Sequence, residues 1–574
     1  MNAVWPCLVA FLVYFLGQRF YARLLAGRVF GLDDSRPTPA HRLRDEVDYL
    51  PTPRFVLFGH HFASITGLSP MLGPAIAVIW GWAPAMIWVV FGAVLVGCVH
   101  DFSALVVSVR ARGLSIGKVA EGIIGARAKG LMLALIFFGV ALAMGVFTIV
   151  ISGLFGGAYG SAVTPSAGLM VIAAVMGWLC TKRGHSVARL TVVGFILQLV
   201  LVWAGQAHPI EWGNRQGWMG ILLFYGFLAS VLPVWSLLQP RDFLNSLLLY
   251  LGLAMAFIGF FLRAPDFAAP AFDPHPAGAP PFYPFIFITI ACGAASGFHA
   301  LVSSGTTAKQ LDRESHAPMI GYGGMVGESI LGLLAVLATT AGIGASGGRS
   351  ARAIWSDHYH DWKAAEGLTA TMRQFIDGAA GFVSEVGVPI ELSRAFIAVV
   401  VVSFALTTLD SATRLLRYNV EEIGQSLHIG ALQNRWSASL VAVLAIGFFA
   451  FYEVDGKPAG SILWAIFGTV NQLLAGLTLL TVTLYLRARG RNAWFTGLPM
   501  LFMLGTTSLA MAENLQSFSN GWTFHPTSDG TAVPWALFAV AAIMALLTLW
   551  LLLEAGAAFA RGRRRIDDLE VFEG

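Results

Sequence analysis

Charged side chains are scarce in this sequence, and their scarcity argues against a soluble fold. Asp, Glu, Lys and Arg make up 12% of the 574 residues, whereas hydrophobic residues make up 56%. Soluble globular domains carry about 25% charged residues, and a helix that crosses a bilayer needs about 20 mostly apolar residues. The composition therefore predicts an all-α polytopic membrane protein in contact with the lipid bilayer.

Motifs for disulfides, metals and nucleotides are also missing. The cysteines occur singly inside apolar runs, so we expect small buried hydrophobes rather than a disulfide or metal set; they are Cys7, Cys98, Cys180 and Cys292. There is no HExxH or CxxC spacing and no nucleotide-binding loop, so we expect no cofactor and no ATP-driven step. The net charge of +4 does not call for nucleic acid as a partner.

The N-terminus lacks the basic region and the small-residue cleavage site of a signal peptide, which predicts a retained first helix. Hydropathy then predicts about 15 transmembrane helices in all. We expect them near residues 3–18, 62–80, 84–109, 130–156, 161–180, 188–207, 219–240, 243–263, 283–304, 319–346, 391–410, 437–453, 461–486, 493–512 and 533–556.

Basic residues cluster after every second expected helix. The clusters lie at residues 19–54, 110–129, 182–189, 241, 309–313, 414–435, 487–491 and 561–565. The positive-inside rule assigns all of them to the cytoplasm, with the N-terminus outside and the C-terminus inside. This alternation requires the segment 62–80 to cross the membrane fully.

The outer loop 347–390 is an exception, because it contains four basic residues. Its sequence from Asp357 to Phe375 is typical of an amphipathic surface helix. The pair His358 and His360, flanked by Asp357 and Asp361, has the residue types of a metal site, but an ordinary solvated loop is the favoured interpretation.

The segment 62–80 contains residues that break helices at membrane depth. Gly67, Ser69, Pro70 and Gly73 interrupt it, and freed backbone groups there are costly unless they line a cavity. Transporters use such breaks to bind anions at half-helix N-termini. We therefore expect the amides of Leu72 and Gly73 to form an anion site; a simple proline kink is the alternative.

A second break is expected at Pro233, within the helix predicted at 219–240. If 62–80 and 219–240 are each the first of five helices, the two sets have inverted topology, as in the LeuT-like 5+5 inverted-repeat fold. The predicted parts are 1–54 with the first helix, 55–207 as repeat 1, 208–436 as repeat 2, and 437–574 with additional helices and a basic tail.

Ionisable residues inside the expected helices are candidates for ion coupling, because burying them is costly. They are His60, His61, His100, Asp101, His299, Glu328 and Asp410. A proton relay through the histidines and carboxylates is one interpretation. A sodium site is another, with the hydroxyls of Ser303, Ser304 and Thr307 opposite the backbone of residues 59–63. A zinc site is a third, without supporting spacing. Helix packing remains the alternative for each residue, and is favoured for Asn471 and Gln472.

With these segments in view, the chain resembles the carbon starvation protein A (CstA) family. The matching stretches are "LFGHHFASITGLSPMLGP", "SVLPVWSLLQPRDFLNS", "SGFHALVSSGTT", "GYGGMVGES", "TTLDSATR" and "FGTVNQLLAG". The resemblance implies a bacterial cytoplasmic-membrane transporter with a LeuT-like fold, taking up pyruvate or small peptides with protons when carbon is scarce. The family's functional motifs fall on His60, His61, Asp101, Pro233, His299, Ser303, Ser304, Glu328 and Asp410. The family has an aliphatic residue or Gln where this chain has His100.

Together these observations predict a proton-coupled importer of a small carboxylate, with pyruvate favoured over peptide and sodium as the alternative coupling ion. The carboxylate would lie between the break at Gly67, Ser69, Leu72 and Gly73 and the one at Val231, Pro233 and Trp235. Peptide uptake, a membrane nutrient receptor and an intramembrane metallo-hydrolase are the alternatives. The oligomeric state is left open.

Overall fold

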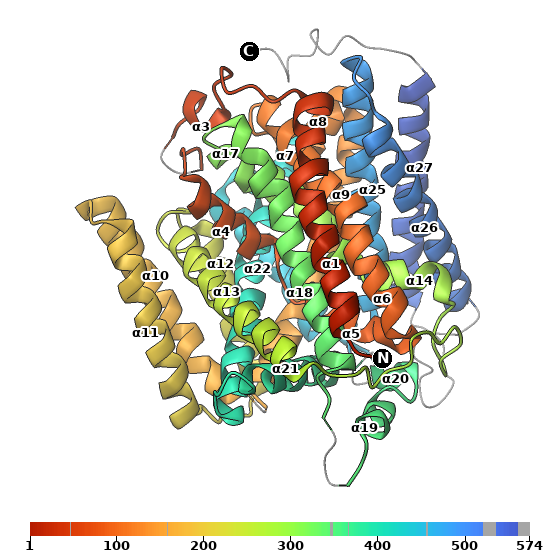
Figure 1. The fold of residues 1–574 in the computed structure, drawn as a ribbon. Helices are drawn as coiled ribbons and strands as arrows, with labels where there is room; N and C mark the ends of the chain where they lie inside the picture. Colours follow the sequence, from red (N-terminus) through yellow and green to blue (C-terminus); the bar gives the residue numbers. More distant parts are fainter. Residues whose placement is uncertain are drawn as a thin grey trace.

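The computed structural model describes residues 1–45, 48–157, 159–344, 348–365, 367–454, 457–519 and 535–560. These residues form a bundle of helices (Figure 1), with one short antiparallel hairpin of β1 (Glu453–Val454) and β2 (Lys457–Pro458). The fold is all-helical as predicted. The basic tail expected at 561–565 lies outside the described residues.

The α-helices follow one another along the chain with short connections. They are α1 (Val4–Leu16), α2 (Ala22–Leu24), α3 (Pro39–Arg42), α4 (Arg54–Ile65), α5 (Ser69–Ala77), α6 (Trp82–Ile87), α7 (Cys98–Arg110), α8 (Ile116–Ile123), α9 (Ala126–Phe155), α10 (Val163–Arg183), α11 (Val187–Ala207), α12 (Arg215–Val231), α13 (Leu238–Arg263), α14 (Phe282–Thr289), α15 (Ala291–Ala294), α16 (Gly297–Val302), α17 (Ala308–Gln310), α18 (Gly323–Thr340), α19 (Ala351–His358), α20 (Trp362–Ala365), α21 (Leu368–Ser384), α22 (Ile390–Ser426), α23 (Arg435–Phe451), α24 (Ala459–Ile462), α25 (Trp464–Ala488), α26 (Trp494–Ser519) and α27 (Trp535–Ala560).

Short π and 3-10 segments extend or join these helices. The π segments are η1 (Gly17–Tyr21), η2 (Leu25–Phe30), η4 (Trp88–Gly97), η6 (Ser303–Thr307) and η8 (Pro318–Tyr322). The 3-10 segments are η3 (Val78–Trp80), η5 (Gly160–Ala162), η7 (Glu314–His316) and η9 (Gly430–Gln433). Such segments are frequent at functional sites within helices.

Ten of the described helices are long and apolar enough to cross a membrane, or eleven when the bent pair of α4 and α5–η3 counts as one span. The protein is therefore a multi-pass membrane protein, but the predicted count of about 15 is not confirmed. Two predicted spans correspond to the shorter helices α12 and α23, of 17 residues each. A third, near 283–304, is divided among α14, α15 and α16.

The break predicted in the segment 62–80 is present. Helix α4 ends at Ile65 and α5 begins at Ser69, with a bend of 49° between them. Helix α5 packs closely on the next broken segment, because a Cβ atom on Gly73 would lie 2.3 Å from the carbonyl oxygen of Thr289. Gly73 thus permits backbone contact between two helices.

The second break is not at Pro233. Pro233 lies in the connection between α12, which ends at Val231, and α13, which begins at Leu238. Arg414 donates hydrogen bonds to the carbonyls of Ala229 and Leu232, so this proline marks a helix end that is capped by a cation. The second break lies instead within 282–310, where α15 is separated from α16 by Ala295 and Ser296.

The loop 347–390 does not form one surface helix. It contains α19, α20 and α21, and α21 buries Met372, Phe375 and Phe382. The hydroxyl of Tyr359 donates to the carbonyl of Ala75 at 2.7 Å, so the loop also contacts the end of α5. A purely amphipathic surface helix was therefore the wrong prediction, because one face is covered by the bundle.

The two ends of the bundle are formed by different segments of the chain. We call the end with α3, α8 and α17 the basic end; it lies at the top of Figure 1. Arg42, Lys118 and Lys309 are on these three helices. The N-terminus and α19–α21 lie at the opposite end (Figure 1).

Candidate functional site

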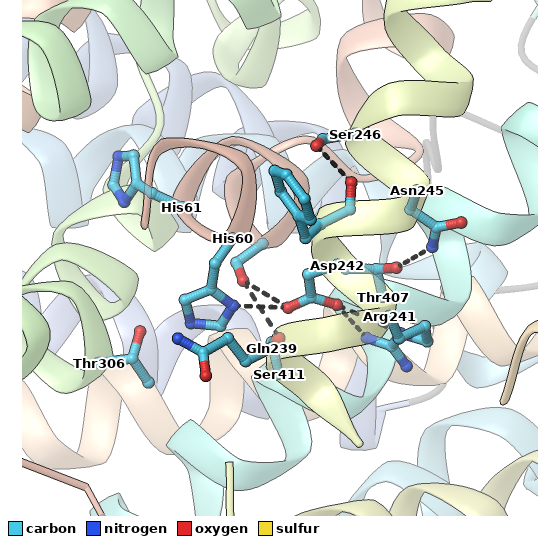
Figure 2. Close-up of polar contacts among 12 residues, drawn as sticks. His60, His61, Gln239, Arg241, Asp242, Asn245, Ser246, Thr306, Thr407 and Ser411 are labelled. Carbon is cyan, nitrogen blue, oxygen red and sulfur yellow. Dashed lines mark hydrogen bonds and ion pairs between the residues drawn. The ribbon is translucent and has the colours of Figure 1, made fainter. Parts of the chain in front are cut away.

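The adjacent histidines of α4 point to different partners, and His60 faces α13 (Figure 2). Its Nδ1 atom lies 2.7 Å from Oδ2 of Asp242, and Nη2 of Arg241 donates to Oδ1 of Asp242 at 2.6 Å. The side chains of His60, Arg241 and Asp242 are at most 2% exposed. Arg241 and Asp242 were not predicted as site residues, because the sequence places them in a basic connection.

Asp410 of α22 extends this group. Both terminal nitrogens of Arg241 contact its carboxylate, one of them at 2.9 Å, and the hydroxyl of Tyr225 donates to it at 2.6 Å. We call His60, Tyr225, Arg241, Asp242 and Asp410 the Arg241 cluster. It holds one guanidinium and two carboxylates, so with all three ionised the buried group has one negative charge in excess, which one bound proton would neutralise.

A second buried group lies on α7, α16 and α18. Asp101 contacts Nδ1 of His100 through Oδ1 and Nδ1 of His299 through Oδ2, both at 2.7 Å. On the other side of the ring, Nε2 of His299 lies 2.9 Å from Oε2 of Glu328, an ion-pair distance without the alignment of a hydrogen bond. We call these four residues the His299 cluster. It brings three predicted coupling residues into direct contact.

His61 faces away from His60 (Figure 2). Its Nδ1 atom lies 2.8 Å from Oγ1 of Thr307, and its ring contacts α18 at Gly324, where a Cβ atom would come within 2.8 Å. Its Nε2 atom is buried without a hydrogen-bond partner among the described residues. The predicted neighbourhood of Thr307 and the His60–His61 segment is therefore present.

A central cavity of about 30 Å³ lies between the two breaks. Gly67, Ser69 and Pro70 line it from the first break, and Cys292, Ser296 and Phe298 from the second. The remaining lining residues come from α4, α9, α16, α22 and α25: Ile65, Gly139, Val140, Ala143, Met144, Phe147, Leu301, Thr408, Phe467, Val470, Asn471 and Leu474. None of the lining residues has an acidic or basic side chain.

Polar groups without partners lie at this cavity. The hydroxyls of Ser69 and Thr408 are buried and have no hydrogen-bond partner among the described residues. In the same part of the chain, the amides of Gly67 and Leu68 donate to no described residue. Buried donors in proteins are almost always paired, so these groups are suited to bind a polar ligand.

Asn471 supports the second break. Its Oδ1 atom accepts hydrogen bonds from the amide of Phe298 at 3.0 Å and from the hydroxyl of Ser296 at 3.2 Å. Its Nδ2 atom donates to the Cys292 sulfur at 3.0 Å. Asn471 therefore lines the cavity as well as packing helices, whereas Gln472 only joins α25 to Thr506 of α26, at 2.7 Å.

Two further cavities continue from the central one. A cavity of about 50 Å³ towards the end with α20 shares Ser69, Cys292 and Phe467 with it. A cavity of about 200 Å³ at the basic end shares Leu301. All three cavities are lined by residues of the second broken segment, 282–310, whereas only the first two are also lined by residues of the first, 54–80.

Several predicted site residues lie elsewhere or act differently. The amide of Leu72 donates to Leu68 within α5 at 2.9 Å, because the helix resumes at Ser69, and so it is not available to an anion. Pro70 sits in the first turn of that helix, where a proline is tolerated. Val231, Pro233 and Trp235 lie beside α10, where Trp235 contacts Lys182. The anion site predicted at Leu72, Gly73 and Pro233 is therefore wrong.

The hydroxyls proposed for sodium are not grouped as one site. Ser304 donates to the carbonyl of Ala300 at 2.7 Å and accepts from the amide of Ile116, while Thr307 contacts His61. Ser303 is buried without a partner among the described residues. In the described part of the chain there is no group of three His, Cys, Asp or Glu residues arranged to hold a metal ion. Of the residues considered for zinc, His60 contacts Asp242 and His61 contacts Thr307, whereas His299 contacts Asp101.

The sequence model described as "Carbon starvation protein CstA" matches residues 2–345 and 357–510, nearly the whole chain. The chain belongs to the CstA family. The peptide transporter CstA of Mycobacterium tuberculosis H37Rv is 35% identical over 598 residues, covering 92% of this chain and 77% of the relative. The peptide transporter CstA of Escherichia coli K12 is 33% identical, covering 89% and 81%.

A relative with a different substrate in its name is also similar. The pyruvate/proton symporter BtsT of Escherichia coli K12 is 30% identical over 597 residues, covering 90% of this chain and 82% of BtsT. Among solved structures, MhsT in complex with L-phenylalanine is 12% identical, with a TM-score of 0.44 over 88% of this chain and 99% of MhsT. The family and the named relatives are transporters, and this chain is a membrane transporter.

Proposed function

We propose that this CstA-family member imports a small monocarboxylate such as pyruvate together with protons. The proposal depends mainly on the chemistry of the central cavity. Its lining includes hydroxyl groups without a hydrogen-bond partner among the described residues, and none of its lining residues has an acidic or basic side chain. A carboxylate needs donors, and the lining of the cavity offers the amide of Gly67 and the hydroxyls of Ser69 and Thr408. A peptide also brings an ammonium group, for which the cavity has no carboxylate.

The cavity must widen to admit this substrate. Its volume of about 30 Å³ is about that of one water molecule. The segments that would have to separate are the first break near Gly67 and the second near Ser296, and the bend between α4 and α5 is a natural hinge. We assign the basic end to the cytoplasm by the positive-inside rule, with the N-terminus outside.

The proton carriers in this proposal are the two buried clusters. The His299 cluster has two histidines and two carboxylates in contact, and the Arg241 cluster reaches neutrality when His60 carries a proton. Imidazole changes charge near neutral pH, so both clusters suit reversible protonation. The 5+5 inverted repeat remains part of the proposal, with one broken segment in each half, 54–80 and 282–310; the second is the third expected helix of its half and not the first.

Uptake into proteoliposomes tests the proposal. We expect labelled pyruvate to accumulate when the outside is more acidic than the lumen, without sodium, and an uncoupler to abolish accumulation. An excess of lactate should compete and an excess of dialanine should not. Accumulation of dialanine without pyruvate would overturn the choice of substrate in favour of peptide uptake, the activity for which the CstA relatives of M. tuberculosis and E. coli are named. Uptake that requires sodium would overturn proton coupling.

A further inference from the structure

A large cavity at the basic end is lined by arginines and takes no part in the proposed transport path. Its volume is about 580 Å³, within the range of small-molecule sites. Among the described residues, Arg36, Arg42, Arg110, Arg112 and Arg489 line it together with one carboxylate, Glu314. These arginines come from three separate segments of the chain.

The single carboxylate is already engaged. Arg110 donates to Oε1 of Glu314 from Nε at 3.2 Å and to Oε2 from Nη2 at 3.1 Å, and the amide of Asp33 also donates to Oε2 at 3.0 Å. Arg110 further donates to the carbonyls of Phe30 and Gly31. The Arg110–Glu314 pair therefore forms one wall of the cavity. Four more guanidinium groups border the same space, and Nε of Arg36 lies 4.0 Å from Oδ2 of Asp33.

The backbone at Arg112 supports a functional role for this wall. Arg112 has a φ of 59°, a left-handed conformation that non-glycine residues adopt at a cost, and Gly113 follows with a φ of 72°. Strained residues are concentrated at functional sites. The positive-inside rule calls for basic residues in these connections, but it does not require them to surround one cavity.

We propose that this cavity binds a polyvalent anion with phosphate groups. Several guanidinium groups around a concave site favour phosphate, to which arginine donates two parallel hydrogen bonds. The phosphate can come from an anionic phospholipid headgroup or from a soluble organic phosphate. The site lies at the end of α7, which also holds Asp101 of the His299 cluster: Arg110 follows Asp101 by nine residues, about 14 Å along the helix.

The test measures thermal unfolding of the purified, delipidated protein in a neutral detergent at constant ionic strength. Inorganic pyrophosphate is the soluble probe. The variant Arg36→Gln/Arg112→Gln removes two exposed arginines of the cavity, and Arg54→Gln/Arg435→Gln removes two exposed arginines outside it, with the same loss of charge. Arg112→Gly, which suits the positive φ, replaces Arg112→Gln if the first variant does not fold.

We expect pyrophosphate to raise the melting temperature of the wild type and of the control variant, and this rise to saturate with concentration. The cavity variant should need at least a tenfold higher pyrophosphate concentration for the same rise. A second arm adds vesicles of phosphatidylcholine with or without cardiolipin. A response to cardiolipin that depends on Arg36 and Arg112, without one to pyrophosphate, assigns the site to lipid; the reverse assigns it to a soluble phosphate. Equal responses of the two variants, or no response to either probe, would overturn the proposal.

Discussion

Replacing Arg241 by glutamine should destabilise the protein strongly, because it leaves two carboxylates buried without their cation. Asp242 and Asp410 are both 0% exposed, and Arg241 contacts each of them through more than one hydrogen bond. Removing one partner of a buried ion pair costs about 3–5 kcal/mol. With no solvent to screen the two charges, we expect Arg241→Gln to lie at the upper end of that range.

The charge argument makes a sharper prediction for combined variants. Arg241→Gln/Asp242→Asn/Asp410→Asn has no buried charge at this place, so it should recover most of the lost stability, as neutral replacements of buried ion pairs often do. Stability is measured as the midpoint of unfolding in mixed detergent and SDS micelles. If Arg241→Gln is as stable as the wild type, or if the triple variant is less stable than Arg241→Gln, the reasoning from buried charge is refuted.

Three further predictions concern the other parts of the site. Asp101→Asn should abolish uphill uptake of pyruvate while leaving exchange down a gradient, since it removes the carboxylate between two histidines; counterflow without concentrative uptake in proteoliposomes is the expected result. Ser69→Ala and Thr408→Val should each raise KM about tenfold, the value of one hydrogen bond to a charged group, with unchanged unfolding midpoints because neither hydroxyl has a partner among the described residues. Gly73→Ala should lower stability by about 1–3 kcal/mol through overpacking against Thr289, whereas Gly130→Ala, in open space, should not.

The first break could be predicted from sequence, but its detail could not. Gly67 and Pro70 predict an interruption of the helix, and α4 does end just before Thr66. The sequence predicted that the second half-helix begins near Leu72, but it begins at Ser69, because a proline in the first helical turn does not prevent the helix from forming. The free donors therefore lie at Gly67 and Leu68, before Pro70 and not after it.

The second break carries no comparable signal. The sequence "ACGAASGF" has no proline, and its interruption depends on Asn471, which lies 173 residues from Phe298 in the chain. Such a long-range hydrogen bond is not visible in local patterns. At Pro233 the sequence predicted a break within a helix, but the structure has a connection between two helices there. A proline between two apolar segments is as compatible with a helix end as with a break. The ionisable residues were correctly expected to be buried, but Arg241 and Asp242 follow a "QP" pair that resembles a connection.

The position of His60 and His61 just before the break between α4 and α5 suggests how proton binding is coupled to substrate binding in the proposed mechanism. His60 and His61 lie in α4, whose last turn leads to Gly67, a lining residue of the central cavity whose amide donates to no described residue. If α4 tilts against α5 at the 49° bend, the contacts of His60 with Asp242 and of His61 with Thr307 change in the same movement. In this mechanism, a carboxylate bound at the break and a proton bound at the histidines both stabilise the same position of α4. Each ligand then binds more tightly when the other is present, and coupling requires this difference in affinity between the two positions of α4.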